Sequence, residues 1–269
     1  METAPIRRSG ATVQAAALLL LCCLPVPGEM RIASLNIERK YGPEGVEQVG
    51  RQAELRAADI LLLQEVLDGS RAHVASDLAV RLGLHVVFEP AFSFSGQFME
   101  GLAILSRYPL RDPAVSRLPH NALLFHTRRR IVLAVTAESP WGPVRIVNTH
   151  LDNRINGDAK RKQLAGIWRA LGDYTGPCVM GGDFNNANFR WILHVLPIPG
   201  AQSLRRVVDR DMERHGFRTP LGGGPGTLHF LGLKLDWIYL RGLRATGSGV
   251  TPIAFSDHNS VWVTAGPAR

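Results

Sequence analysis

Short runs rich in Val, Ile and Leu, each bounded by Gly, Pro, Asn or Asp, constrain the fold of this chain more than any other feature. Runs of this length and composition predict β-strands, and several are apolar enough to be buried on both faces. Between them, residues 45–57, 70–82, 158–171 and 203–214 carry apolar side chains at helical spacing, which predicts helices that cover the sheets. The strand-like runs are RIASLNI, DILLLQE, HVVFE, GLAILS, RIVLAVTA, VRIVNTH, CVMGGDF, LDWIYL and HNSVWVTA.

The order of these segments favours an α/β fold. The stretch RIVLAVTAESPWGPVRIVNTH predicts a hairpin, because ESPWGP places Pro and Gly between two strand-like runs. Antiparallel neighbours therefore mix with helical crossovers, and we expect a four-layer sandwich of two mixed β-sheets packed face to face, with helices on the outer faces. The 269 residues are 45% hydrophobic and contain no internal repeat or low-complexity linker, so a single folded domain is expected.

The first residues differ in composition from the rest. Arg7 and Arg8 precede the apolar run AAALLLLCCLPV, which is too short to span a bilayer and is typical of a secretory signal peptide. We expect a signal peptide over residues 1–28 and a folded domain over residues 29–269, in a secreted or periplasmic protein. Two alternatives stay open. The Cys22 and Cys23 pair could accept a lipid, although Leu21 is bulky for that signal, and translation from Met30 would leave the protein in the cytoplasm.

The chain is basic, with 31 Lys and Arg against 23 Asp and Glu and a formal net charge of +8. A field of this sign attracts polyanions, so nucleic acid and anionic lipid headgroups are the partners that fit, while a basic surface that only aids solubility is the alternative. Only Cys178 follows residue 28, which excludes an internal disulfide from the mature chain, and we interpret it as a small core residue. No feature indicates an obligate protein partner, and we expect a monomer.

Polar residues stand where the strand-like runs begin or end. If the sheets pack face to face, these ends converge at one rim, and so many carboxylates would repel one another unless a cation lay among them. Oxygen atoms of Asn36, Glu65 and Asp257, with water, suit Mg²⁺ or Mn²⁺, whereas structural zinc would need a second cysteine or a tight histidine cluster. Taken alone, VMGGDFNN predicts a turn, and Glu65 predicts a buried salt bridge to Arg or Lys. The polar residues concerned are Asn36, Glu65, His150, Asp152, Asp183, Asn185, Asp236, Asp257 and His258.

The motifs that carry these residues occur in a recognisable order. The set SLNIE, LLLQEV, MEGLAILSR, VNTHLD, GGDFNN, LDWIYLRG and SDHNSVWV resembles the endonuclease/exonuclease/phosphatase superfamily. That group contains deoxyribonuclease I, exonuclease III type AP endonucleases, inositol polyphosphate phosphatases and neutral sphingomyelinases. The resemblance runs from Met30 to Thr264, and it rests on the order and spacing of the motifs because each one alone is weak.

The resemblance implies a role for each site residue. Glu65 would be the main metal ligand, with Asn36 and Asp257 nearby. The pair Asp183 and Asn185 would bind and orient the attacking water and the phosphate, and His258, polarised by Asp236, would act as base or stabiliser.

His150 corresponds to a histidine of the deoxyribonuclease I and lipid-phosphatase branches. Glu100 falls where deoxyribonuclease I has the carboxylate partner of that histidine. The AP endonuclease branch lacks the pattern formed here by Thr149, His150 and Leu151, which disfavours repair of abasic sites.

The chemistry of phosphodiester hydrolysis fits this set of residues. The reaction needs charge neutralisation, which a metal, the Asn185 amide and an imidazolium can supply. It also needs proton transfer, which a histidine with one nitrogen held by a carboxylate performs near neutral pH. The two expected pairs, His258 with Asp236 and His150 with Glu100, would permit one base and one acid. Which histidine plays which part, and whether Asp183 is the base, stay open.

We expect a metal-dependent phosphodiesterase that acts on nucleic acid. Within the basic run 128–130, Arg130 or Arg129 is the candidate phosphate contact, with a solvated strand edge as the alternative. A phospholipid or sphingomyelin phosphodiesterase, or an inositol-phosphate phosphatase, is the enzymatic alternative. For the apolar run FRWILHVLPIPG, a core helix followed by a loop is favoured over a segment that enters a membrane surface. A non-catalytic binding protein is disfavoured, because the full polar set is retained.

Overall fold

The computed structural model describes residues 28–70, 72–121 and 128–268, and it contains two mixed β-sheets. The expected signal peptide lies outside the described residues, apart from Gly28. The first sheet has seven strands in the order β13 (Leu243–Thr251), β14 (Ser260–Pro267), β1 (Met30–Asn36), β2 (Ile60–Gly69), β5 (Phe98–Ser106) and β4 (His85–Ser95), with β3 (Ala72–His73) paired to β2. The second has five strands in the order β12 (Asp236–Arg241), β9 (Cys178–Asp183), β8 (Gly142–His150), β7 (Ile131–Ser139) and β6 (Leu110–Arg117).

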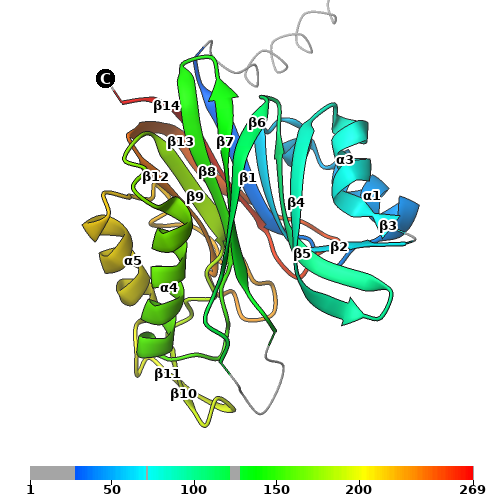
Figure 1. The fold of residues 1–269 in the computed structure, drawn as a ribbon. Coiled ribbons are helices and arrows are strands. Elements are labelled where there is room, and N and C mark those ends of the chain that lie inside the picture. Colours follow the sequence, from blue (N-terminus) through cyan, green and yellow to red (C-terminus); the bar gives the residue numbers. More distant parts are fainter. Residues whose placement is uncertain (1–27, 71, 122–127, 269) are drawn as a thin grey trace, which may run out of the picture.

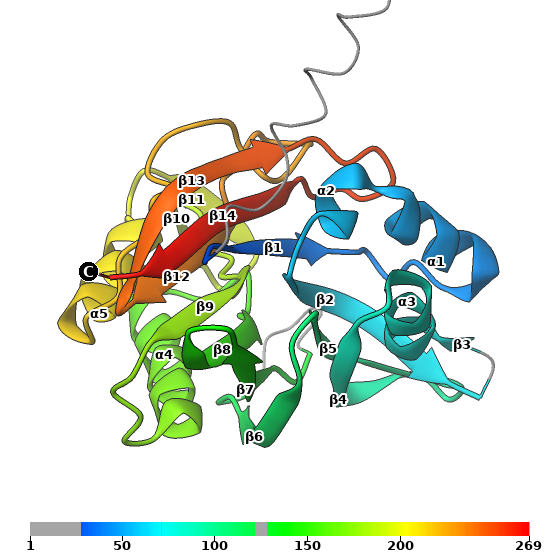
Figure 2. The same cartoon turned by 90° about the horizontal axis from the view of Figure 1, so that it is seen from above.

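The two sheets pack face to face, with helices on both outer faces (Figures 1 and 2). Helices α1 (Gly42–Arg51), α2 (Ala53–Arg56) and α3 (Val74–Leu82) lie on the side of the first sheet, and α4 (Gly157–Leu171) and α5 (Leu204–Arg214) on the side of the second. Along β2, Leu62 belongs to the core between the sheets, while Leu61 and Leu63 pack beneath the first group of helices. This alternation is the two-residue period of a strand buried on both faces. The predicted four-layer sandwich is confirmed.

Two parallel strand pairs bring the polar strand ends together. Strands β1 and β2 are parallel, with Asn36 opposite Gln64, and β8 and β9 are parallel, with His150 opposite Asp183. Strand β12 runs antiparallel to β9 and begins with Asp236 opposite Asp183. A Cβ on Gly182, which has φ +136°, would overlap the carbonyl oxygen of Thr149, so only glycine allows this close pairing. Three predicted site residues therefore lie side by side on neighbouring strands.

The predicted helix over the apolar run FRWILHVLPIPG is wrong. The run forms a separate two-stranded hairpin of β10 (Phe189–Ile192) and β11 (Leu196–Pro199). Pro197 and Pro199 lack the backbone N–H that a helix requires, whereas they are tolerated on a strand edge.

The other helical expectations hold with shifted boundaries. The helix over 45–57 is divided by an extended Gln52, and the one over 70–82 begins at Val74 because His73 belongs to β3. The expected hairpin around ESPWGP is present as β7 and β8, joined between Ser139 and Gly142.

Within the described ranges, no helix is both long and apolar enough to cross a membrane.

Candidate active site

His258 and Asp236 form the predicted pair. The Nδ1 atom of His258 lies 2.8 Å from Asp236 Oδ2, and both side chains are buried. Ser256 fixes the turn that carries His258, because its Oγ accepts a bond from the His258 N–H at 3.1 Å and donates to the carbonyl oxygen of Asn36 at 2.6 Å. The turn after β13 is thereby fastened to the end of β1. The other ring nitrogen of His258, Nε2, is 3.9 Å from Asp183 Oδ2.

Asp183 lies at the centre of the site. The Asn185 side chain donates to Asp183 Oδ2 at 3.1 Å and to the Leu151 carbonyl at 2.9 Å, and the Asn185 N–H donates to Asp183 Oδ1 at 3.0 Å. Asn185 has φ +46°, in the left-handed region that non-glycine residues rarely adopt. Burial and the nearby charge of Asp236 raise the pKa of Asp183 to about 7. The carboxyl group can therefore gain or lose a proton near neutral pH.

Burial and neighbouring carboxylates act in opposite directions on His258. Burial disfavours the charged imidazolium, but Asp236 and then Asp183 outweigh it and raise the pKa of His258 to about 10. In this structure His258 is a cation at neutral pH and faces Asp183.

His150 also faces Asp183, but as a neutral ring. Burial lowers its pKa well below the usual value, and the nearby charge of Arg130 lowers it further. The Nδ1 atom of His150 is 2.8 Å from Arg130 Nη1, and its Nε2 is 3.3 Å from Asp183 Oδ2. Because a guanidinium only donates, Nδ1 must accept, which places the proton on Nε2 and directs it toward Asp183.

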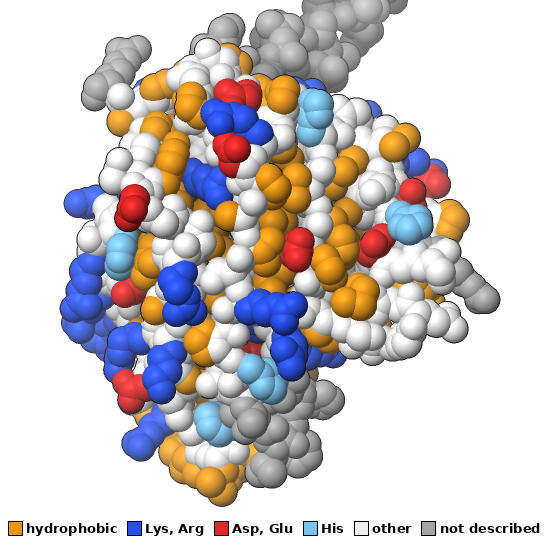
Figure 3. Space-filling view, in the orientation of Figure 1, with side chains coloured by type: hydrophobic (Ala, Val, Ile, Leu, Met, Phe, Trp, Pro, Cys, Tyr) orange, Lys and Arg blue, Asp and Glu red, His pale blue; other side chains and the backbone are white. Residues whose placement is uncertain are grey.

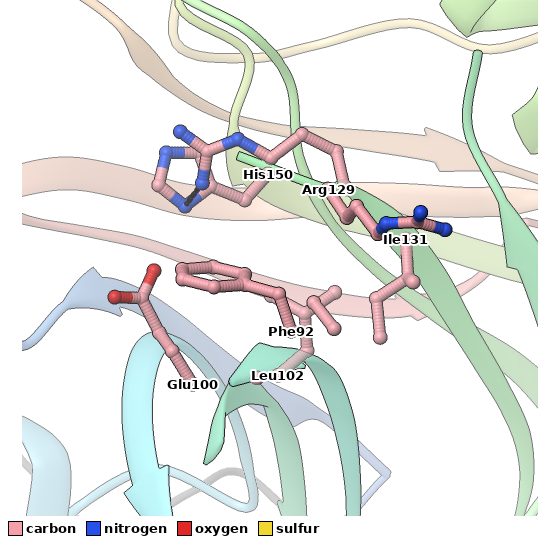
Figure 4. A pocket seen from close by; sticks show the side chains of 9 residues that line it. Phe92, Glu100, Leu102, Arg129, Ile131 and His150 are labelled. Carbon is pink, nitrogen blue, oxygen red and sulfur yellow. Dashed lines mark hydrogen bonds between the residues drawn. The ribbon is translucent and has the colours of Figure 1, made fainter. Parts of the chain in front are cut away.

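The predicted pair between His150 and Glu100 is not formed. Glu100 instead contacts Arg39 Nε at 2.6 Å and Arg128 Nη1 at 3.1 Å. Figure 4 shows Glu100 and His150 in one small pocket between the sheets, with the ring of Phe92 beside them. A neutral imidazole cannot compete with two guanidinium groups for a buried carboxylate. The structure therefore assigns arginine partners to Glu100.

Glu65 protrudes from an irregular point of its strand. The register between β2 and β5 shifts between Leu63 and Val66, and Glu65 has φ +55°. A bulge of this kind re-aims a side chain at the cost of backbone strain. The Glu65 Oε2 atom lies 2.6 Å from Arg39 Nη2. Glu65 therefore forms the salt bridge to arginine that its sequence alone predicted.

The expected metal ligands lie at one rim. Asn36 is opposite Gln64, the residue before Glu65, and Ser256, the residue before Asp257, bonds to the Asn36 carbonyl. Among the described residues, Asp183, Asp236 and His258 also offer one ligand atom each within 4.8 Å of one another. The donors are mainly oxygen, as hard divalent cations prefer. The oxygen atoms of Glu65, Asn36 and Asp257 therefore fit a bound cation by their chemistry. Asp236 Oδ1 is buried without a hydrogen-bond partner in the described part of the chain, so it is also able to accept a bond from a ligand in the site.

Sequence reasoning missed two cationic residues of the site. Arg39 joins Glu65 and Glu100, but it stands in a loop with no periodic pattern that could have indicated it. Lys160 is fully buried, and its Nζ donates to the carbonyl oxygens of Asp152, Phe184 and Asn185 at 2.7, 2.9 and 3.1 Å. A signal for Lys160 existed, because it shares the apolar helical face of Leu164 and Ile167.

Arg130, the candidate phosphate contact, lies against the active-site histidine. Arg130 contacts His150, and its Nε lies 3.4 Å from Asp152 Oδ1. Arg129, the other candidate of the basic run, is exposed. Asp257 is exposed next to the buried His258.

Comparisons with known proteins identify the family and the fold. A model of the Endonuclease/Exonuclease/phosphatase family matches residues 33–258. A solved endonuclease/exonuclease/phosphatase from Beutenbergia cavernae DSM 12333 is similar with a TM-score of 0.70 and 19% identity, covering 90% of this chain and 72% of its own. The human Nocturnin catalytic domain with bound sulfate has a TM-score of 0.67 and 19% identity, covering 91% and 96%. ANGEL2, a 2′,3′-cyclic phosphatase in complex with adenosine-2′,3′-vanadate, has a TM-score of 0.62 and 15% identity, covering 89% and 96%.

Proposed function

The chain belongs to the endonuclease/exonuclease/phosphatase family and is a phosphoester hydrolase of that type. From this premise we propose that it is a divalent-metal-dependent phosphodiesterase. In this proposal it cleaves nucleic acid by in-line attack of water. The observation that carries the proposal is the convergence of His150 and His258 on Asp183, with Asp236 holding the far nitrogen of His258. Groups that take up and release protons are thereby placed beside oxygen donors for a cation.

In the proposed mechanism, Asp183 orients the attacking water and accepts its proton. Asn185 fixes Asp183 through both its backbone N–H and its side-chain amide. His258, oriented by Asp236, directs Nε2 toward the reacting phosphate, where the imidazolium stabilises the developing negative charge and gives its proton to the leaving oxygen as that P–O bond breaks. His150, with its proton on Nε2, donates a hydrogen bond to the same region.

Mg²⁺ or Mn²⁺ is the proposed cofactor, held by Glu65 and Asn36, with Asp257 nearby. When bound, such an ion polarises a phosphoryl oxygen and lowers the charge that repels the nucleophile. Arg39 lies against Glu65 and adds a fixed positive charge at this end of the site.

Two observations favour nucleic acid as the substrate class: the positive charge of the protein and the substrate type of a protein with a similar fold. The net charge of +8 and the arginine run 128–130 next to His150 favour a polyanion. ANGEL2, which has a similar fold, is a 2′,3′-cyclic phosphatase and was solved in complex with adenosine-2′,3′-vanadate, and this supports a nucleic-acid phosphodiester here. A lipid phosphodiester is the second candidate, favoured by the exposed apolar side chains of the hairpin β10–β11.

The test compares the purified protein on plasmid DNA, RNA, abasic duplex, sphingomyelin and inositol phosphates, with Mg²⁺, with Mn²⁺ and with a chelator. We expect metal-dependent cleavage of DNA or RNA, lost in His258→Ala and kept in His85→Ala, which removes an exposed histidine at the far end of β4 from Phe92. Turnover of none of these esters would reject the hydrolase mechanism. Turnover of sphingomyelin alone would reject the nucleic-acid substrate and support the second candidate.

A further inference from the structure

The hairpin β10–β11 exposes a concentrated set of apolar side chains. Leu193 is 76% exposed and Leu196 is 62% exposed, and the neighbouring side chains are about two-fifths exposed. Figure 3 shows hydrophobic side chains gathered at the lower end of the molecule, where β10 and β11 lie in Figure 1. A soluble surface rarely concentrates large apolar residues in this way without a binding role. We call this set the apolar tip: Ile192, Leu193, Val195, Leu196 and Ile198.

Two residues at the turn of the apolar tip, one of them an apolar leucine, have a strained left-handed backbone. Leu193 and His194 have φ +49° and +60°, and Val195 N–H donates to the Ile192 carbonyl at 3.0 Å, which closes the turn. Turns with two left-handed residues strongly prefer Gly, Asn or Asp. A leucine in this position lowers folding stability and gains no burial in return. We therefore expect the Leu193 side chain to contact another molecule.

The base of the hairpin is fastened firmly beside the active site. The Asn156 side chain donates to the Trp191 carbonyl at 3.0 Å and accepts from the Trp191 N–H at 2.9 Å. His194 Nδ1 is 2.6 Å from the carbonyl of Arg154. The hairpin begins just after Asn185 and is clamped to the loop that follows His150. The apolar tip is thus a fixed projection from the rim of the active site.

The charges around the apolar tip are positive. No Asp or Glu occurs between Phe184 and Val208, whereas Arg190 lies within the hairpin and is exposed. Arg154 lies 5.6 Å from the centre of the Trp191 ring. Apolar side chains that project beyond arginines match a surface with an apolar interior and anionic headgroups.

A second protein chain is a less suitable partner for the apolar tip than a lipid surface. Strand β11 carries Pro197 and Pro199, which cannot donate ladder hydrogen bonds, so its outer edge offers few donors to an added strand. The apolar tip also consists of five residues, whereas a stable protein interface takes roughly 20–30 residues from each partner.

A second exposed apolar site lies next to His258. Phe230 is 87% exposed and Leu231 is 55% exposed. Their loop is joined to the catalytic turn, because His229 N–H donates to the Asp257 carbonyl at 2.9 Å. Apolar side chains therefore project from two loops that leave the rim of the active site.

We propose that the apolar tip docks the protein on an anionic lipid bilayer, with Leu193 and Leu196 entering the acyl region and Arg190 contacting headgroup phosphates. The docking does not depend on which ester the site cleaves, since the tip residues lie outside the proposed machinery.

The test is co-sedimentation of the expected mature protein, residues 29–269, with vesicles of phosphatidylcholine alone or with phosphatidylglycerol added, because the apolar run of residues 15–26 would bind vesicles by itself. We expect binding to the anionic vesicles, reduced by salt, and reduced by about tenfold or more in Leu193→Asn/Leu196→Asn because apolar area no longer leaves water. Asn suits the left-handed backbone at residue 193, and the side chain at residue 196 is mostly exposed, so this variant should fold. The matched control is Val80→Asn on α3, at a residue 85% exposed, and it should bind as wild type does.

The outcomes separate docking from catalysis. The double variant should keep full activity on a soluble phosphodiester, so loss of vesicle binding with retained turnover supports the proposal. Equal vesicle binding by wild type and double variant, or no binding to anionic vesicles, would overturn it. Dimerisation in solution that the double variant abolishes, measured by light scattering, would instead assign the tip to a second copy. Vesicle binding by a protein that cleaves no phosphoester would leave docking intact and reject the proposed function.

Discussion

Two pairs of carboxylates in the active site are neutralised in different ways. Glu65 and Glu100, the arginine-held pair, share the guanidinium of Arg39 at 2.6 Å each. Asp183 and Asp236, the histidine-held pair, contact imidazoles instead. A guanidinium stays charged at every pH at which proteins fold, so the arginine-held pair keeps a fixed charge. In the histidine-held pair, burial and the nearby charge of Asp236 raise the pKa of Asp183 to about 7, so this carboxyl group exchanges a proton near neutral pH. The contrast indicates that proton transfer belongs to the histidine-held pair and that the arginine-held pair sets the local charge.

The largest expected effect is on the histidine-held pair. Asp236→Asn keeps the size of the side chain but removes the charge that orients His258, so kcat/KM on the preferred phosphodiester should fall by about 10² to 10⁴-fold. Steady-state kinetics measure the loss, and circular dichroism checks that the variant is folded. Activity within a few-fold of wild type would show that His258 does not need Asp236, and the division between the pairs would fail.

The next effect is on cation binding at the arginine-held pair. Arg39→Gln removes the positive charge that lies 2.6 Å from Glu65, and the freed carboxylate should bind Mn²⁺ more tightly, by on the order of tenfold. Titration calorimetry or the electron paramagnetic resonance of free Mn²⁺ measures the affinity without turnover. Glu65→Gln is the matched variant and should weaken binding. Unchanged affinity in both variants would remove the proposed metal from Glu65.

The strands and the rim of the site could be predicted because they follow from local patterns. Apolar runs identified the central strands, and the polar residues at their ends converge because β1 with β2, and β8 with β9, run parallel. Strands β6 and β13 were not predicted, since both are edge strands with many partly exposed residues.

The ionic partners could not be predicted, because they depend on where loops cross the site. Arg39 reaches Glu100 over a sequence separation of 61 residues, and Arg128 reaches it over 28. Nothing in the local sequence of Glu100 distinguishes these partners from His150. The hairpin β10–β11 was mistaken for a helix for a related reason, since a short apolar run has no clear period and only its prolines excluded a helix.

A smaller effect concerns the support beneath the histidine-held pair. Lys160→Met should lower the free energy of unfolding by about 2–4 kcal/mol, because three buried carbonyl groups lose their donor. Burial lowers the pKa of Lys160 from 10.5 to about 7, so between these values the unfolded chain binds a proton that the folded protein does not. Wild-type stability relative to Lys160→Met should therefore rise with pH across that window, by up to about 1.4 kcal/mol per unit. Urea unfolding at several pH values measures it, and a difference that falls with pH would contradict the lowered pKa.

The smallest expected effect is that of Glu100→Gln, a substitution that tests whether Glu100 is the catalytic partner of His150. If Glu100 held His150 as a catalytic pair, Glu100→Gln would cost as much activity as Asp236→Asn. In the structure Glu100 contacts Arg39 and Arg128, while Arg130 fixes the histidine. Glu100→Gln should therefore change kcat by less than about threefold, which is about 0.65 kcal/mol of barrier. Thermal denaturation measures the stability lost with the contacts to arginine. A loss of a hundredfold in kcat would restore Glu100 to proton transfer, and the contrast between the two carboxylate pairs would then describe only the resting enzyme.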